Sequence, residues 1–545
     1  MSYQAVVRNQ NGQLKAVALV GIHSVMLGFD FVHANTDRAT FLGFAIHRID
    51  QTTNEARWLP GQLRFKGDAA DFGEDVPSNR GPFQKFYWGD YTTKPGHDYQ
   101  YSIHPTFGKP DKLQRQQPVV LNVTTATNDP GQIGVYFNRG LTATPAYLQR
   151  FGDVYPKDVQ DNAAYQWLSR GLKEALLDFI SAAAPGDELK IAIYEFELED
   201  IIEALKKAKN LGVHIKLLFH ASKSGKNNQK RTRTNRANVK LLKLAKENAI
   251  PRTNVPKISH NKFMVHVKAG KAVRVWTGST NFTEAGLFLQ TNVGLLFTDQ
   301  TIAMAFDQYF ELLRQNLEGK AMQAQCLQLV TGVNQAVGSN RTLFFSPVPG
   351  KDLLTDAVNL IMTAQKVVLI SCPFGLDEII TDALNTNYQN ILEYGLVNKT
   401  NERRLIKVLD RSINSSFNAP NWVKTFDGRA WDARARGNHK IHVKSLVVDP
   451  WDAQSKVLIG SANFSDESVN GNDENAILVT GDQRLAAIAA TEFMRMFEHY
   501  KFRSHKAAVE SGRKSRYLDD TGSWSDGYFD PKDSKFRARL VFSGQ

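Results

Sequence analysis

The sequence predicts an α/β protein in which two similar α/β units face each other, preceded by a β-sandwich-like domain. Three observations predict this architecture. The chain has 545 residues, whereas one domain usually holds roughly 100 to 200. An alternation of helical and strand-like segments occurs twice, and a polar motif recurs with the same spacing in both copies. We therefore expect three domains, over residues 1–130, 131–335 and 336–545.

The first domain is predicted from short runs of alternating apolar residues that Gly, Pro, Asn and Asp interrupt. The clearest runs cover residues 16–20, 24–31, 41–47 and 99–104. Its charged and aromatic residues form no cluster that indicates a site, so its role stays open.

The two α/β units are predicted from repeated helix and strand patterns. In the first unit we expect a helix over 161–183, a strand over 189–195, a helix over 201–207 and a strand over 213–219. In the second unit the same order gives a helix over 353–364, a strand over 366–372, a helix over 376–384 and a strand over 404–409. This order favours β-sheet cores covered by helices.

Composition limits the class of protein and of partner. Apolar residues make up 42% and charged residues 22% of the chain, as in folded globular proteins. The net charge of +12 favours polyanionic partners such as nucleic acid or anionic lipid. Cys326 and Cys372 are too few for a disulfide framework and are expected to be buried thiols. The early apolar run at 16–27 lacks the layout of a signal peptide, and no run has the roughly 20 apolar residues of a membrane helix, so we expect a cytoplasmic protein.

One polar motif carries the chemistry, and it occurs twice with the same spacing. Each copy has a His, a Lys two residues later, and a Gly-Ser-x-Asn-Phe segment after a further fifteen residues. The first copy comprises His260, Lys262, Gly278, Ser279, Asn281 and Phe282, and the second His442, Lys444, Gly460, Ser461, Asn463 and Phe464. Residues two apart share one face of a strand, so each copy presents an imidazole and a cation together. Two copies facing each other would place histidines on opposite sides of a phosphate, which suits in-line displacement.

This pattern resembles the signature of the phospholipase D superfamily, H-x-K-x4-D followed by G-S-x-N. The likeness runs from about residue 131 to the end and implies a pseudo-dimer of two superfamily units on one chain. The second copy also has Asp449 and a run similar to the family's N-x-E-N, which includes Glu474. The first copy departs from the signature, with Val267 in place of Asp and Thr291-Asn292 in place of Glu-Asn.

The resemblance implies that one histidine attacks phosphorus and forms a phosphohistidine while the other protonates the leaving oxygen. We expect His260 as nucleophile and His442 as general acid; the opposite assignment stays open, because Glu474 belongs to the second copy and only Glu284 is a possible stand-in in the first. Lys262, Lys444, Asn281 and Asn463 would stabilise the phosphoryl oxygens, with Asp449 and Glu474 counted among the catalytic residues. No metal or cofactor is expected. The predicted substrate-binding residues are Ser279, Ser461, Lys230, Arg231, Arg233, Arg236, Arg434 and Arg436.

Two basic stretches near the histidines favour nucleic acid as the substrate. One, before His260, carries Lys230, Arg231, Arg233 and Arg236 and is read as a loop entering a helix; the other, before His442, carries Arg434 and Arg436. The predicted function is a metal-independent nuclease or related phosphodiesterase. A phospholipase that hydrolyses or exchanges lipid headgroups and a non-catalytic polyanion-binding module are the alternatives. Both copies lie on one chain, so the site needs no second chain, and the oligomeric state stays open.

Overall fold

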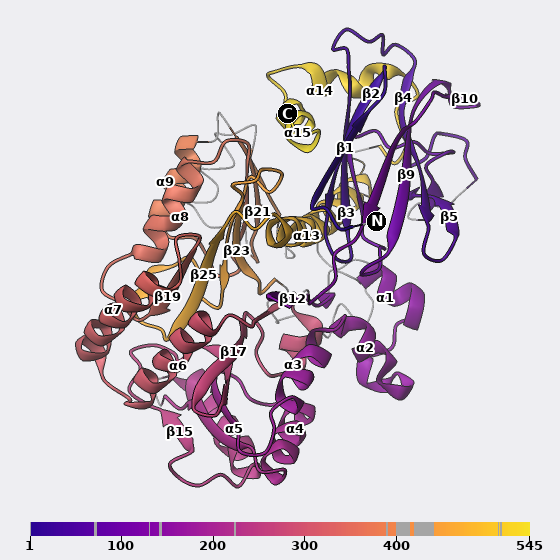
Figure 1. The fold of residues 1–545 in the computed structure, drawn as a ribbon. Helices are drawn as coiled ribbons and strands as arrows, with labels where there is room; N and C mark the ends of the chain where they lie inside the picture. Colours follow the sequence, from indigo (N-terminus) through magenta and orange to yellow (C-terminus); the bar gives the residue numbers. More distant parts are fainter. Residues whose placement is uncertain are drawn as a thin grey trace.

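The computed structural model describes residues 2–69, 74–129, 131–140, 144–222, 225–387, 391–398, 415–418, 441–510, 512 and 515–545. Figure 1 shows a β-rich N-terminal part and two sheets with flanking helices, arranged around the long helix α13 (Gln483–Glu510). The predicted α/β architecture with an N-terminal β-rich domain is confirmed.

The N-terminal part consists of two antiparallel sheets with one core between them, in the orders β1-β2-β3-β8 and β10-β9-β4-β5, the second joined by β11. Their alternating side chains bury one face of each strand against the other sheet. The strands are β1 (Val6–Gln10), β2 (Leu14–Val20), β3 (Val25–Phe31), β4 (Phe41–Asp50), β5 (Glu55–Trp58), β8 (Tyr87–Asp90), β9 (Asp98–Lys109), β10 (Lys112–Arg115) and β11 (Val119–Thr124), with a small ladder of β6 (Pro60–Gly61) and β7 (Val76–Pro77).

The two α/β units contain seven-stranded sheets of the same order, β12-β18-β17-β16-β13-β14-β15 and β19-β25-β24-β23-β20-β21-β22. The first comprises β12 (Ile133–Phe137), β13 (Glu188–Ile193), β14 (His214–His220), β15 (Ala249–Arg252), β16 (Lys262–Lys268), β17 (Lys271–Gly278) and β18 (Val293–Phe297). The second comprises β19 (Arg341–Ser346), β20 (Val367–Ser371), β21 (Leu392–Leu396), β22 (Ser415–Asn418), β23 (Lys444–Val448), β24 (Lys456–Gly460) and β25 (Glu474–Thr480). The equal strand orders confirm the internal duplication.

Helices cover both sheets. They are α1 (Thr144–Phe151), α2 (Ala163–Ser169), α3 (Leu172–Ser181), α4 (Glu199–Asn210), α5 (Lys226–Leu241), α6 (Gln300–Arg314), α7 (Gly319–Ala336), α8 (Asp352–Met362), α9 (Glu378–Asn387), α12 (Asp466–Asn470), α14 (Asp526–Phe529) and α15 (Ser534–Phe542), with the short helices η2 (Pro156–Asp158), η3 (Gln160–Asn162), η4 (Ala285–Leu289) and η6 (Gly522–Ser525). None of the helices in the described ranges is both long and apolar enough to cross a bilayer.

Two sequence predictions need correction at the level of elements. The helix predicted over 161–183 is interrupted, because Arg170 and Gly171 have φ angles of 52° and 92°, which end α2 before α3 begins. The strand predicted over 404–409 lies outside the described residues; the strand that follows α9 is β21.

The C-terminal tail packs on both the N-terminal sandwich and the second α/β unit, where the Phe542 ring lies 5.5 Å from that of Trp451. Trp524 and Tyr528 belong to the sandwich core, and the Trp524 indole donates to the carbonyl of Phe41 at 2.7 Å. Arg539 forms a buried ion pair with Asp30, in which Nη1 lies 2.8 and 2.7 Å from the two carboxylate oxygens. Figure 1 shows α14 and α15 beside the first strands. The two ends of the chain therefore complete one domain.

Candidate active site

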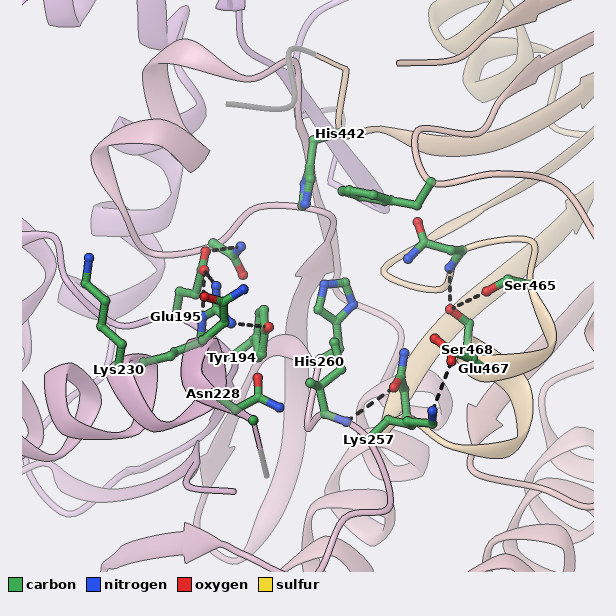
Figure 2. A pocket seen from close by; sticks show the side chains of 18 of the residues that line it. Tyr194, Glu195, Asn228, Lys230, Lys257, His260, His442, Ser465, Glu467 and Ser468 are labelled. Carbon is green, nitrogen blue, oxygen red and sulfur yellow. Dashed lines mark hydrogen bonds and ion pairs between the residues drawn. The ribbon is translucent and has the colours of Figure 1, made fainter. Parts of the chain in front are cut away.

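The two histidines of the repeated motif meet in one cleft between the α/β units. His260 lies just before β16 and His442 just before β23, not within these strands. The backbone N–H of each histidine donates to a carbonyl of the other unit, His260 to Asp473 O at 2.9 Å and His442 to Thr291 O at 3.1 Å. The imidazole centroids are 6.4 Å apart, and Figure 2 shows the rings pointing toward each other. One polypeptide thus presents two imidazoles to one ligand.

Glu474 of the second unit orients His260 of the first. Its Oε2 lies 2.8 Å from His260 Nδ1 and accepts the Ser461 hydroxyl at 2.9 Å. Its Oε1 accepts from Ser468 Oγ at 3.2 Å and Asn472 Nδ2 at 3.1 Å. Burial raises the pKa of Glu474 to about 7, while Lys262 and Lys444 oppose the rise. Because Nδ1 faces the carboxylate, Nε2 is the atom of His260 left for chemistry.

Asn292 of the first unit holds the equivalent place beside His442. Its Oδ1 lies 2.8 Å from His442 Nδ1 and accepts the Ser279 hydroxyl at 2.7 Å. Its Nδ2 donates to Gly286 O at 2.8 Å, which fixes the amide with its oxygen toward the imidazole. His442 Nδ1 must then carry the proton of this contact.

Glu284, the stand-in that the sequence suggested for the first unit, is bound to the hydroxyl of Tyr165 instead. The sequence comparison set Thr291 in the place of Glu474, which is wrong, because Asn292 is the residue that faces the histidine. The spacing does signal this, since Asn292 follows Ser279 by the same thirteen residues that separate Glu474 from Ser461. Each histidine is therefore held by a side chain from the other unit, a carboxylate for His260 and an amide for His442.

The two motif lysines are buried beneath the histidines. Lys444 Nζ donates to His442 O at 2.7 Å, and Lys262 Nζ likewise contacts His260 O. Burial lowers the pKa of Lys262 to about 7, and lowers that of Lys444 well below its usual value. A bound phosphoryl group would restore their charge, since an anion favours the ammonium form.

The asparagines and the serines of the repeated motif have different places in the site. Asn281 Nδ2 donates to Glu195 at 2.6 Å, and both Asn281 and Asn463 line the cleft. The hydroxyls of Ser279 and Ser461 are fully buried and donate to Asn292 and Glu474. We therefore assign these serines to positioning the histidine partners, not to the substrate contact that the sequence suggested.

Asp449 lies away from the cleft and organises the start of β20. Its carboxylate accepts the backbone N–H groups of Gln365, Lys366 and Val367 at 2.7 to 2.8 Å. The contacts of Asp449 therefore indicate a structural role in place of the expected catalytic one. His266 of the first unit is bound to Asp187 at 2.8 Å.

The cleft holds about 1160 Å³, and its two walls differ in charge. The wall of the first unit carries Lys226, Lys230 and Arg231 of α5 together with Glu195 and Glu197, whereas Ser465, Glu467 and Ser468 line the wall of the second. Figure 2 shows Lys230 and Glu195 on one side of His260 and Ser465, Glu467 and Ser468 on the other. Arg231 Nε binds Glu195 at 2.7 Å, and its guanidinium lies 4.2 Å from the Tyr194 ring centroid. The basic stretch before His260, which the sequence predicted as a loop entering a helix, is mostly helix α5. Lys257 of the first unit and Glu467 of the second form an ion pair at 3.0 Å.

The remaining predicted substrate contacts are not in the cleft lining. Arg233 and Arg236 are exposed on α5 outside the lining. Arg434 and Arg436 lie outside the described residues.

Burial lowers the pKa of both site histidines well below the usual value, and the two motif lysines lower it further. Both imidazoles are therefore neutral in the empty cleft near pH 7. A neutral imidazole is the form that a nucleophile requires, and an entering phosphodiester anion would raise the proton affinity of the other. Within the described residues, no group of three or more His, Cys, Asp or Glu side chains is placed to hold a metal ion.

Comparison with known proteins identifies the two units. The family model described as cardiolipin synthase, PLD-like domain matches residues 176–314 and 357–499, together just over half of the chain. These ranges contain both histidine motifs. No curated protein sequence matches the chain.

Several solved structures resemble the fold at low identity. Phosphatidylserine synthase from Haemophilus influenzae Rd KW20 is 12% identical, with a TM-score of 0.43 over 64% of this chain and 94% of that one. Yeast tyrosyl-DNA phosphodiesterase is 15% identical, with a TM-score of 0.35 over 57% of this chain and 87% of that one. Polyphosphate kinase from Porphyromonas gingivalis is 13% identical, with a TM-score of 0.38 over 58% of this chain and 46% of that one.

Proposed function

Since this chain belongs to the phospholipase D-like family, whose members have phosphodiesterase or phosphotransferase chemistry, we propose that it hydrolyses nucleic acid through a phosphohistidine without a metal. The observation that carries the proposal is the pair of facing imidazoles with unequal partners, a carboxylate for His260 and an amide for His442. A carboxylate raises the basicity of an imidazole and suits a nucleophile. An amide adds no charge, so an imidazolium beside it gives up its proton more readily.

In the first step, Nε2 of His260 attacks phosphorus while the bond to the leaving oxygen breaks. His442, protonated when the anionic substrate binds, gives its Nε2 proton to that oxygen, so the departing group leaves as an alcohol. The retained phosphoryl group is then bonded to His260, whose Nδ1 proton is shared with Glu474.

In the second step, His442 is neutral and takes a proton from water as the water oxygen attacks phosphorus. The P–N bond breaks, His260 recovers its lone pair, and the product is a phosphomonoester. Lys262 and Lys444 are buried next to the two histidines. In this proposal their ammonium groups neutralise the charge on the non-bridging oxygens in both transition states.

The basic wall formed by α5 favours nucleic acid over the alternatives. Lys226 and Lys230 are exposed at the cleft, where they suit the neighbouring phosphates of a polynucleotide. A site for phospholipid is expected to have a broad apolar rim. Among the described residues, the large apolar side chains that line this cleft are only Tyr194, Ile258 and Phe374.

The test is product analysis in chelator with labelled single-stranded DNA, double-stranded DNA, RNA and phospholipid vesicles. We expect nucleic-acid cleavage by the unaltered protein and none by His260→Ala or His442→Ala, with His214→Ala, an exposed histidine, as matched control. Headgroup release alone would establish the phospholipase alternative. Binding without any cleavage would support the binding module, and activity that requires an added divalent ion would contradict the metal-free mechanism.

A further inference from the structure

One short segment supplies two of the contacts that orient His442. Thr291 O accepts the backbone N–H of His442, and Asn292 Oδ1 faces its Nδ1. The segment comprises the short π-helix η4 and the residues up to Asn292, which lead into β18. It has some hydrogen bonds of its own, such as Gln290 N–H to Ala285 O at 2.8 Å, and further contacts come from another part of the chain.

Asn138, the residue after β12, makes these contacts. Its Nδ2 faces three carbonyl oxygens of the segment, at 2.7 Å from Gln290, 2.9 Å from Leu287 and 3.4 Å from Gly286. Its Oδ1 accepts the backbone N–H of Asn292 at 2.8 Å. Asn138 is 1% exposed, so its loss would remove hydrogen bonds from buried backbone groups of the segment, of which Gly286 O would keep the amide of Asn292 as a donor.

The backbone around Asn138 is itself held by two buried arginines. Arg170 Nε donates to Phe137 O at 2.9 Å, and Arg495 donates to Asn138 O at 3.1 Å and to Arg139 O at 3.2 Å. Both guanidiniums pair with Glu492, at 2.5 and 2.9 Å, and they lower the pKa of Glu492 to about 2 despite its burial.

This support comes partly from outside the family match. Asn138 and Arg170 precede residue 176, where the match begins, while Glu492 and Arg495 lie on α13. Helix α13 also packs on β2 of the N-terminal sandwich, where a side chain at Gly21 would meet Thr491 at 2.2 Å. The segment that orients His442 is thus anchored by the junction of the sandwich with the α/β units.

The second unit has a smaller version of the same arrangement. By strand register, Ser346 pairs with Glu474 and takes the place of Asn138. Its hydroxyl lies 2.8 Å from Ser468 O and 2.9 Å from Asn472 O, on the loop that precedes Glu474. One buried side chain therefore supports the partner of each histidine, Asn138 for His442 and Ser346 for His260.

We propose that Asn138 is a positioning residue for the general acid, acting through Asn292 to hold His442 ready to protonate the leaving group. This inference rests on the proposed function and adds to its machinery a residue that follows β12 and precedes the family match. It predicts that loss of Asn138 slows the protonation-dependent step and spares the attack by His260.

The experiment compares two esters under single-turnover conditions with enzyme in excess. Thymidine p-nitrophenyl phosphate releases a leaving group that needs no proton, whereas a thymidine dinucleotide releases an alkoxide that does. We expect Asn138→Ala to slow dinucleotide cleavage roughly 10- to 100-fold and nitrophenolate release less than about twofold. Ser346→Ala should slow both, because it acts on His260, and Asn138→Ser should recover part of the loss. Asn128→Ala is the matched control, since its side-chain amide donates to Val135 O, within the same strand β12, at 3.1 Å and lies away from the segment that contacts His442.

Equal slowing of both esters by Asn138→Ala, or no slowing of either, would overturn the inference. If the unaltered protein releases nothing from either ester, the proposed function itself fails, and imidazole ¹⁵N spectra then decide the positioning role. We expect the His442 Nδ1 signal, assigned with His442→Asn, to shift in folded Asn138→Ala. An unchanged signal would contradict the positioning of His442 by Asn138.

Discussion

At the scale of single residues, the two halves of the site differ in the side chain that contacts each histidine. Both histidines, both lysines and both serines are repeated, yet His260 faces the carboxylate of Glu474 and His442 the amide of Asn292. The difference of one charge separates the proton affinities of two otherwise similar imidazoles. It gives a duplicated site the two unlike groups that acid and nucleophile require.

The carboxylate can be tested with a matched pair of substitutions. We expect Glu474→Gln to lower the rate of phosphohistidine formation roughly 100-fold, because the amide cannot share the imidazolium charge. Glu284→Gln should have little effect, since Glu284 contacts Tyr165 and not a histidine. Rapid-quench measurement of the acid-labile adduct tests both variants, and equal losses would remove Glu474 from its assigned role.

His220 should make stability depend on pH. It is fully buried beside the site, accepts the backbone N–H of Ser259 at 3.1 Å, and burial lowers its pKa from 6.5 to about 4. Between these values the unfolded chain binds more protons than the folded one, so stability present above pH 6.5 is lost as the pH falls toward 4. The slope should be about 1.4 kcal/mol per pH unit for this group.

The measurement is urea unfolding of the unaltered protein and His220→Asn between pH 7 and 5. Asparagine keeps an acceptor for Ser259 but does not titrate, so the variant should show the shallower loss. Parallel curves for the two proteins would contradict the assignment.

The sequence predicted both His/Lys pairs because repetition at fixed spacing distinguishes functional polar residues from ordinary ones. It missed the role of Asn292 because a change from Glu to Asn hides the equivalence. The sequence predicted a catalytic role for Asp449 and not its structural one, because the three backbone N–H groups that it accepts belong to residues 365–367, far away in the sequence. Asn138 gave no sequence signal, since a side chain that binds carbonyls belongs to no motif.

At the scale of elements, α5 gives the cleft its electrostatic polarity. Lys226, Lys230 and Arg231 of α5 line the cleft, whereas Arg233 and Arg236 are exposed outside its lining. The basic run was visible in the sequence. Which of its cations line the cleft depends on how α5 packs against the rest of the first unit, which the run itself does not indicate.

This polarity predicts unequal effects for two double substitutions that remove the same charge. Lys226→Ala/Lys230→Ala should weaken binding of single-stranded DNA and reduce the slope of log K against log salt by about 1.4, since each phosphate contact contributes about 0.7. Arg233→Ala/Arg236→Ala should change the slope by less than half as much. Fluorescence anisotropy from low to high salt measures both, and equal changes would show that α5 acts only through net charge.

At the scale of the whole molecule, the two chain ends share a core that local patterns did not predict. Each strand of the sandwich is readable from alternation, whereas the Trp524 contact with Phe41 joins residues almost the full chain length apart. At Gly28 an added Cβ would lie 1.6 Å from Phe542 O, so α15 sits directly on β3. The tail looked like a charged segment with scattered aromatics because its partners lie in another domain.

The shared core makes the sandwich depend on the tail, and two tryptophans test this. Trp524 is 9% exposed within the sandwich core, and Trp58 lies half-buried on the outer sheet face beside His47 and His104. We expect Trp524→Ala to lower the free energy of unfolding by about 3 to 5 kcal/mol through the cavity and the lost hydrogen bond, and Trp58→Ala by less than about 1.5 kcal/mol. Calorimetry gives the stabilities, and limited proteolysis reports whether cleavage appears first within residues 2–125. If Trp58→Ala proves the more damaging change, or if proteolysis of Trp524→Ala begins in the α/β units, the tail is not what stabilises the sandwich.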